Sequence, residues 1–157
     1  MPRVGIICDT HGLLRVGARR LLRGCDHIIH GGDIGNPGVL EALAALAPLT
    51  AVRGNNDSGA WAEALRKSEF VRVGGIGIYV VHDIADMDID PAAGTVQVVI
   101  AGHSHKPSIG RRDGVLYVNP GSCGPRRFKL PVSLGELLIR GSSIEPRIVE
   151  LSGEDLG

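Results

Sequence analysis

Short apolar runs alternate with helical patterns in the first half of the chain. Three runs rich in Val, Ile or Leu predict strands, at residues 4–8, 28–29 and 49–52. Between them, apolar residues recur at helical spacing within residues 14–22 and 40–47. Asn36 and Pro37 are typical N-cap and first-turn residues of the second helix, which Pro48 ends. This alternation predicts parallel strands joined by right-handed crossovers.

Apolar runs in the second half are instead separated by short turns that contain glycine. Residues 70–73 and 76–81 flank a Gly-Gly turn, residues 115–118 follow an Asp-Gly turn, and residues 137–140 and 144–149 flank a Gly-Ser-Ser turn. Such spacing favours antiparallel pairing throughout this half. No linker or repeat divides the chain. We therefore expect one α/β domain over residues 1–157, with a mixed sheet or two packed sheets.

Polar residues able to bind metals follow five of the predicted strands. They are Asp9, His11, Asp33, Asn55, His82, His103 and His105. In α/β sheets, ligands bind at the edge formed by the carboxyl ends of the strands. A single His or Asp in such a place is more often a hydrogen-bonded core group or a turn cap, and Asn55 and His82 alone favour that interpretation. Seven such residues at five strand ends favour a shared site.

The seven side chains supply two carboxylates, one carboxamide and four imidazoles. Oxygen and nitrogen donors without thiolate suit divalent Mn, Fe, Ni, Co or Zn. Seven ligands are too many for one ion, whereas two ions sharing a carboxylate would use them well. Two ions about 3.5–4 Å apart can hold a hydroxide and clamp a phosphate during in-line attack.

The charge balance excludes some partners. Seventeen basic residues match seventeen acidic ones, which argues against a dedicated nucleic-acid-binding or membrane-binding surface. The three cysteines are widely spaced and predict neither a disulfide framework nor a structural zinc site. The chain shows no apolar run of membrane-spanning length and no signal-peptide pattern. We expect a cytoplasmic protein. The sequence leaves the oligomeric state open, and a homo-oligomer is one of the possibilities.

The motif blocks resemble those of the calcineurin-like metallophosphoesterases. They occur in the family order as Asp9-Thr10-His11, Gly32-Asp33, Gly54-Asn55-x-Asp57, His82 and Gly102-His103-Ser104-His105. The small size and the block Asn119-Pro120-Gly121-Ser122 are similar to the compact bacterial and archaeal phosphodiesterase branch, the YfcE-like group. The resemblance implies a four-layer α/β/β/α sandwich of two mixed sheets.

The resemblance also implies a binuclear centre and its ligands. Asp9, His11, Asp33 and His105 would bind one ion, and Asp33 would bridge to a second ion completed by Asn55, His82 and His103. The cofactors would be two divalent transition-metal ions, with Mn favoured over Fe, Ni, Zn or Co. A hydroxide held between them would attack phosphorus in line. Asn55 would stabilise the developing charge, and Asp57 would orient its neighbours.

The implied enzyme is a metal-dependent hydrolase of small phosphoric esters. Two divalent ions, two carboxylates and a hydroxide leave a single positive charge, which matches a phosphodiester better than a phosphomonoester. The implied catalytic residues are Asn55, Asn56, Asp57 and His82.

Two positions depart from the family pattern. Asn56 stands where the family often has a histidine that protonates the leaving group. A carboxamide cannot act as a general acid near neutral pH, so aryl diesters should be better substrates than alkyl diesters. Asp83 stands where the family usually has glycine. Its carboxylate is either a partner for a histidine or points into solvent. The presence of all seven ligand types favours catalysis, whereas Asn56 keeps open an alternative, a non-catalytic interaction module such as the retromer subunit of the same fold.

Three other features allow more than one interpretation. The acidic stretch 83–90 predicts a solvated loop near the mouth of the site. Arg126 and Arg127 either face the substrate or belong to a surface charge patch. His30, just before the Gly31-Gly32-Asp33 block, is either a buried, hydrogen-bonded residue or a partner of a metal ligand.

Overall fold

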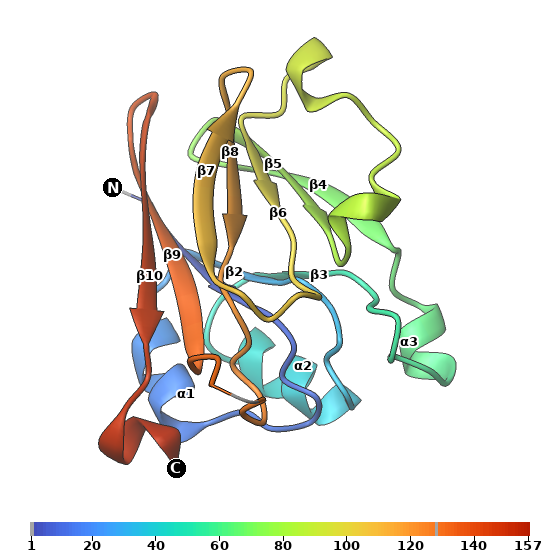
Figure 1. Cartoon of the computed structure of the whole chain (residues 1–157), viewed down its shortest axis with the longest axis vertical. Coiled ribbons are helices and arrows are strands. Elements are labelled where there is room, and N and C mark those ends of the chain that lie inside the picture. Colours follow the sequence, from blue (N-terminus) through green and yellow to red (C-terminus); the bar gives the residue numbers. More distant parts are fainter. Residues whose placement is uncertain (1, 128) are drawn as a thin grey trace.

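A computed structural model describes residues 2–127 and 129–157 and contains two five-stranded sheets (Figure 1). The first sheet has the strand order β10-β9-β1-β2-β3. Its strands are β1 (Arg3–Ile7), β2 (His27–His30), β3 (Leu49–Ala51), β9 (Ser133–Arg140) and β10 (Ser143–Glu150). The second sheet has the order β4-β5-β6-β8-β7. Its strands are β4 (Ser68–Val73), β5 (Ile76–Val81), β6 (Val98–Ile100), β7 (Ser108–Arg112) and β8 (Val115–Asn119). The expected sandwich of two mixed sheets is confirmed.

Strand directions agree with the sequence pattern in the first half and differ in part of the second. Strands β1, β2 and β3 are parallel, as the alternation with helices predicts. The hairpins β4–β5, β7–β8 and β9–β10 are antiparallel, as their turns predict. The expectation that the whole second half is antiparallel was wrong, because β6 is parallel to both β5 and β8. Long connections, which hairpin signals do not describe, allow these parallel neighbours.

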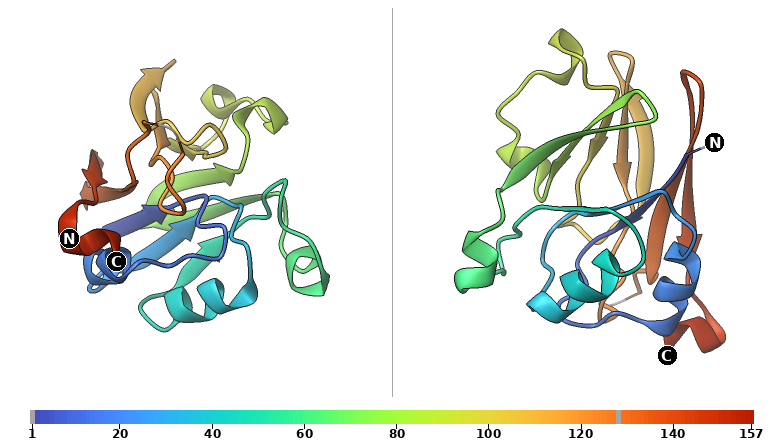
Figure 2. Two further views of the ribbon diagram at one scale, coloured as in Figure 1. Left: turned by 60° about the horizontal axis from the view of Figure 1, so that its bottom comes forward. Right: turned by 180° about the vertical axis from the view of Figure 1, so that it is seen from behind.

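The main core lies between the two sheets. Ile6 and Leu137 of the first sheet are buried in one cluster with Ile78, Ile100 and Leu116 of the second. These residues alternate along their strands with residues of the opposite face, as a sandwich requires. Burying such apolar side chains contributes roughly 1.5–3 kcal/mol each. The two sheets are seen one above the other in the views of Figure 2.

Helices cover the outer face of the first sheet. A second core cluster joins Ile7 and Ile28 of that sheet to Leu22 of α1 (Val16–Leu22) and Leu43 of α2 (Pro37–Ala44). Asn36 accepts a hydrogen bond from the Val39 N–H and Pro37 opens the helix, so the predicted start of α2 is confirmed. The C-terminal 3₁₀ helix Gly153–Leu156 lies beside α1, and α3 (Ala60–Glu63) follows β3.

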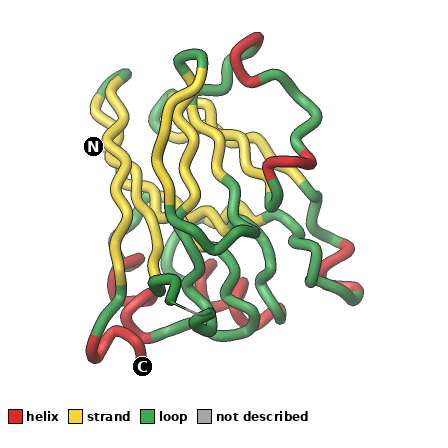
Figure 3. The backbone as a smooth tube through the Cα atoms, in the orientation of Figure 1, coloured by secondary structure: helices red, strands yellow, loops and turns green. Residues whose placement is uncertain are grey.

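The outer face of the second sheet is covered by the segment between β5 and β6. That segment contains only the short 3₁₀ helices Ile84–Asp86 and Pro91–Ala93. Met87 and Val96 pack there against Tyr79 and Val99 of the sheet. Figure 3 shows the longer helices beneath the first sheet and mostly loop over the second. Within the described residues, no helix is long and apolar enough to span a membrane.

The loops that follow the strands of both sheets meet. The Asp9 N–H donates to Gly32 O, 3.0 Å away, which links the loops after β1 and β2. The Gly102 N–H donates to His82 O at 2.9 Å, which links the loops after β5 and β6. The fold therefore brings the predicted strand-end residues toward one region.

Candidate metal centre

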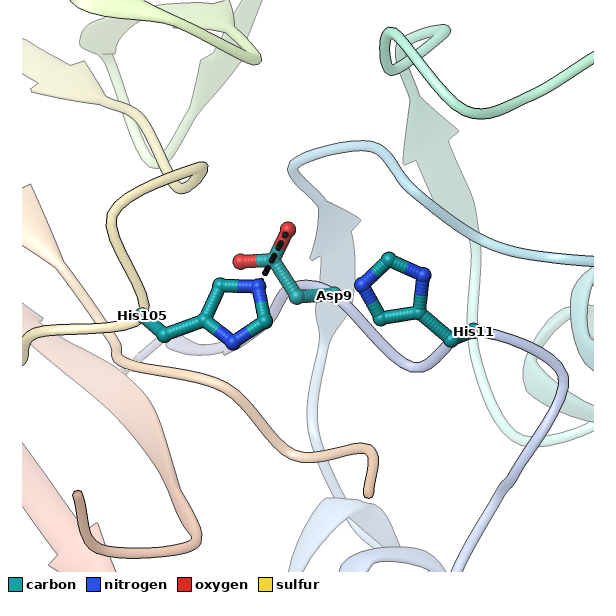
Figure 4. A group of neighbouring side chains, drawn as sticks. All are labelled: Asp9, His11 and His105. Atoms are coloured by element: carbon teal, nitrogen blue, oxygen red, sulfur yellow. Dashed lines mark ion pairs between the residues drawn. The ribbon is translucent and has the colours of Figure 1, made fainter. Parts of the chain in front are cut away.

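Two overlapping groups of side chains could each hold a metal ion. One consists of Asp9, His11 and His105, and the other of Asp9, Asp33 and His82. Within each group, the ligand atoms all lie within 4.8 Å of one another. Figure 4 shows the rings of His11 and His105 approaching the Asp9 carboxylate from two different loops. Five of the seven predicted ligands are thus brought together.

The two carboxylates both lie between histidines. Asp9 Oδ1 is 3.7 Å from His105 Nε2 and 3.9 Å from His82 Nε2. Asp33 Oδ2 is 3.3 Å from His82 Nε2 and 3.9 Å from His11 Nε2. Either carboxylate could therefore serve two ions. Asp9 belongs to both groups, whereas the motif resemblance gives the bridging role to Asp33.

His103 and Asn55 lie at the border of this cluster. The His103 ring meets the His82 ring edge-on, with centroids 5.3 Å apart, and its Nε2 is 3.6 Å from Asp83 Oδ2. The His103 side chain is 46% exposed. Asn55 is exposed and lines one pocket together with His82 and Asp83. His103 and Asn55 thus lie near His82, but both are exposed to solvent.

The backbone is strained at the candidate ligands. Within the described chain, six non-glycine residues have a positive φ, and five of these are Asp9, His11, Asp33, His103 and His105, with values of 46° to 70°. Left-handed conformations are uncommon for such residues and cost of order 1–3 kcal/mol each. Strain of this kind clusters at functional sites, where the surrounding structure enforces it.

Two glycines allow the ligand loops to approach one another. A Cβ atom at Gly54 would lie 2.1 Å from Asp33 N and 2.2 Å from Asp33 Oδ1. A Cβ atom at Gly32, whose φ is +101°, would lie 2.7 Å from His82 Nδ1. Both contacts are far too short, so larger residues would displace Asp33 or His82.

Hydrogen bonds fix the orientation of several candidate ligands. Gly31 O can only accept, so His82 Nδ1 donates to it at 2.8 Å and His82 Nε2 is left as a lone-pair donor for a metal. Asn56 donates to both oxygens of Asp33, from its backbone N–H at 2.9 Å and its side-chain amide at 3.1 Å. The predicted catalytic residue Asn56 thus faces Asp33.

Asp57 and His30 tie the ligand loops together. Asp57 is buried and accepts hydrogen bonds from the N–H groups of Gly35 and Gly54. His30 is fully buried; its Nδ1 accepts from the Gly32 N–H and its Nε2 contacts Thr10 Oγ1 at 3.0 Å. The interpretation of His30 as a buried, hydrogen-bonded residue is confirmed.

Unpaired polar atoms test whether these residues fit a metal. Among the described residues, seven buried side-chain atoms have no hydrogen-bond partner. Five belong to candidate ligands, namely Asp9 Oδ1 and Oδ2, His11 Nε2, His82 Nε2 and His105 Nδ1. An unpaired buried polar group costs roughly 1–3 kcal/mol, so such a concentration requires an explanation. Coordination of divalent cations would satisfy the atoms of Asp9, His11 and His82, and these residues therefore fit the implied metals. At His105 the nitrogen directed at Asp9 is Nε2, so Nδ1 is not accounted for by such an ion.

Burial and neighbouring charges separate the pKa values of the two carboxyl groups. Burial raises the pKa of Asp9 to about 7, although the charge of His82 opposes this. Burial also acts to raise the pKa of Asp33, but the close approach of His82, whose Nε2 is 3.3 Å away, and the hydrogen bond from the Asn56 N–H outweigh it and lower that pKa to about 2. The Asp9 carboxyl group is thus the one whose negative charge most needs a nearby cation.

The imidazoles of the first group are held neutral. Burial, assisted by the charge of Arg127, lowers the pKa of His105 to about 4. Burial also lowers the pKa of His11, against the attraction of Asp33. For His82, burial acts to lower the pKa, but the nearby Asp33 carboxylate and the hydrogen bond to Gly31 raise it overall. Neutral imidazole is the form that binds metals.

Two pockets adjoin the border residues. The first, which we call the charged pocket, is lined by residues including Arg53, Asn55, Lys67, His82, Asp83, Asp86 and Asp88. The second, which we call the apolar pocket, is lined by residues including Ile84, Val99, Ala101, His103, Tyr117 and Val118. Asp83 lies between them and lines both. The predicted solvated acidic loop thus lies beside the site.

Three features of the site were open or unrecognised in the sequence. Asp83 faces His103, so its carboxylate is a partner for a histidine and does not simply point into solvent. The charge of Arg127 acts on the pKa values of Asp9, His11 and His105, so Arg127 lies near enough to influence the candidate ligands. The apolar pocket was not recognised, because Val99, Ala101 and Tyr117 are typical strand residues and only the fold places them beside His103.

Comparisons with known sequences agree with this geometry. The sequence model of the calcineurin-like phosphoesterase superfamily domain matches residues 3–140. A protein of Methanothermobacter thermautotrophicus named probable metallophosphoesterase is 28% identical over 93% of this chain and 91% of its own length. A second protein of that name, from Methanocaldococcus jannaschii, is 31% identical over 76% of this chain and 67% of its own length.

Solved structures share the fold. Vps29 of Chaetomium thermophilum superposes with a TM-score of 0.81 at 18% identity, over 96% of this chain and 88% of its own. A structure described as a novel archaeal phosphodiesterase superposes with a TM-score of 0.75 at 23% identity, over 94% of this chain and 99% of its own. Wild-type Vps29 of Entamoeba histolytica in complex with Zn²⁺ has a TM-score of 0.72 at 23% identity, over 94% and 98% of the two chains.

Proposed function

Because the chain belongs to the calcineurin-like phosphoesterase superfamily, we propose that it is a metal-dependent phosphoesterase that hydrolyses phosphodiesters. Its membership confirms the resemblance found in the motif blocks. The observation that carries the proposal is the concentration of unpaired buried atoms on Asp9, His11 and His82. Such atoms suit divalent cations, and divalent cations suit the negative charge of a phosphoric ester.

We assign the metal ligands as two sets. Asp9, His11 and His105 form the first set, and His82 with the border residues Asn55 and His103 forms the second. Asp33 lies between them. Divalent ions held there, with Mn favoured, would lower the pKa of water and would offset charge on the phosphate. The protein's own part is to fix the ligands, through the strained loops and the hydrogen bonds of His82 and Asp57.

The proposed reaction is a hydrolysis at phosphorus. The oxygen of water forms a new bond to phosphorus, one ester P–O bond breaks, and the departing oxygen takes a proton. Asn55 donates a hydrogen bond to the phosphoryl oxygens, and Arg127 attracts the anion. Asn56 is held by Asp33 and cannot supply the proton, so the departing oxygen takes it from water. Good leaving groups should therefore react faster.

Hydrolysis of bis(4-nitrophenyl) phosphate tests the proposal. After dialysis against a chelator, added Mn²⁺ should restore turnover, and His82→Ala should lose at least about 100-fold in kcat because His82 touches both carboxylates. His27→Ala is a matched control, because His27 contacts Thr50 and lies outside both metal groups. A dialkyl phosphate should be hydrolysed far more slowly than the aryl diester.

A non-catalytic interaction module is the second candidate. The similarity to Vps29 structures favours it, because their fold covers nearly the whole chain. The same assay decides between the two functions. If the protein binds Mn²⁺ tightly but hydrolyses no diester, the enzymatic proposal is wrong and the binding role is favoured.

A further inference from the structure

The apolar pocket opens directly beside the candidate ligand His103. Its floor is formed by Val99 on β6 and by Ala101 just after that strand, both buried on the outer face of the second sheet. Tyr117, the register partner of Val99, and the exposed Ile84 form its sides. The short 3₁₀ turns over this sheet leave the pocket uncovered, because no long helix lies there among the described residues.

Three of the polar residues that line the pocket, Asp83, Ser104 and Asn119, already form hydrogen bonds. The Asn119 amide donates to Gly102 O and to Ser104 Oγ, both at 3.1 Å. Asn119 Oδ1 accepts from the Gly121 N–H at 2.9 Å. The Asp83 carboxylate caps the Ala85 N–H and faces His103. A ligand in this pocket would thus be held by apolar contact and shape more than by specific hydrogen bonds.

The volume and the walls of the pocket suit a single aromatic ring. It encloses about 240 Å³, and a cavity of roughly 150 Å³ is large enough for benzene. The Tyr117 ring offers a partner for stacked or edge-on aromatic contact. The charged pocket differs, since Arg53, Lys67 and Asp86 at its walls would have to lose water against an apolar ring.

We propose that the apolar pocket binds an aromatic ring carried by one ester group of the phosphodiester substrate. This rests on the proposed function, because the phosphate must lie at the candidate metal ligands for the ring to reach past His103. The pocket thereby selects aryl or nucleoside diesters over small alkyl diesters.

Equilibrium binding to the Mn²⁺-loaded protein tests this inference without turnover. Calorimetry with dimethyl phosphate, methyl phenyl phosphate and thymidine 5′-(methyl phosphate) compares no ring, a directly attached ring and a ring beyond a sugar. At least one aromatic ligand should bind about tenfold more tightly than dimethyl phosphate, because its ring is removed from water. An advantage of the phenyl ligand alone identifies an aryl ester, and an advantage of the thymidine ligand alone identifies a nucleoside.

A pocket-filling variant supplies the control. Ser108 is exposed at the rim, so Ser108→Trp should place its indole in the pocket and reduce the aromatic advantage to less than about twofold. Ile109→Trp should retain the advantage, because successive residues of β7 point to opposite faces. Dimethyl phosphate should bind all three proteins equally.

Two results overturn the inference. One is equal binding of all three ligands to the unmodified protein, and the other is an aromatic advantage that persists in Ser108→Trp. Failure of dimethyl phosphate itself to bind would instead contradict the proposed function, on which the inference rests.

Discussion

Asn56 is the residue whose role differs most between sequence and structure. The motif position suggests a group that acts on the departing oxygen, yet both of its donors are directed at the Asp33 carboxylate. A carboxylate held by two hydrogen bonds keeps one orientation, which favours metal binding. We therefore expect Asn56 to act as a positioning residue for Asp33.

Removing the Asn56 side chain should weaken metal binding. Asn56→Ala retains the backbone donor to Asp33 Oδ1 and loses the amide donor to Oδ2. Loss of such a partner typically costs 10–100-fold in metal affinity, and we expect about tenfold because one donor remains. Titration with Mn²⁺ by calorimetry measures this, with Ser58→Ala in the same exposed loop as the control. Unchanged Mn²⁺ affinity together with reduced turnover would return Asn56 to a direct catalytic role.

The backbone conformation of the ligand residues could not be predicted from the sequence. Residue types and strand ends identify Asp9, His11 and Asp33 as candidates, because polar groups after apolar strands stand out. Their positive φ values do not follow from residue type, since aspartate and histidine rarely adopt them. The tertiary structure enforces these conformations through contacts between loops that are distant in the sequence.

At the scale of elements, the loops after β2 and β3 are locked against each other. Gly54 permits this, because any Cβ there would meet the backbone and carboxylate of Asp33. Gly54→Ala should therefore destabilise the fold by about 1–3 kcal/mol through overpacking. The shift of Asp33 should also lower Mn²⁺ affinity.

Guanidinium unfolding and Mn²⁺ titration measure the two effects of Gly54→Ala. Gly110→Ala on β7 is the control, because a Cβ atom there meets nothing within 4 Å and should change neither property. If Gly54→Ala unfolds and binds Mn²⁺ as the unmodified protein does, the close approach of the two loops is not required.

Strand order was harder to predict than strand position. Turn signals identify each hairpin, but they carry no information on which hairpin lies next to which strand, so the parallel neighbours of β6 were missed. Strand β9 begins at Ser133. The sequence pattern predicted its start only at residue 137, because Gly135 and Glu136 interrupt the run of apolar residues. Glu136 is buried there and paired with Arg3 and Arg147 at 2.9 and 2.6 Å, a compensation that only the sheet reveals.

At the scale of the whole molecule, the buried His30 adds to the backbone hydrogen bonds that connect the loops after β1 and β2. Its Nδ1 accepts from the Gly32 N–H, so the proton is on Nε2, which donates to Thr10 Oγ1. Thr10 in turn donates to Ile34 O at 2.9 Å. The imidazole is thus neutral in the folded state, where burial lowers its pKa from 6.5 to about 3.

Stability should therefore fall as the solution becomes acidic. Below pH 6.5 the unfolded chain binds a proton at His30 that the folded chain does not bind, so His30 favours unfolding over the window from pH 6.5 to about 3. Between pH 7 and pH 5 this costs about 2 kcal/mol, at roughly 1.36 kcal/mol per pH unit below 6.5.

His30→Gln lacks this proton uptake but leaves the Gly32 N–H without its acceptor, which costs about 1–3 kcal/mol at pH 7. The stability difference between the two proteins, measured by guanidinium unfolding in chelator, should shrink by about 2 kcal/mol from pH 7 to pH 5, because the contributions of the other histidines cancel in the comparison. A difference that stays constant with pH would mean that His30 does not remain neutral in the folded protein.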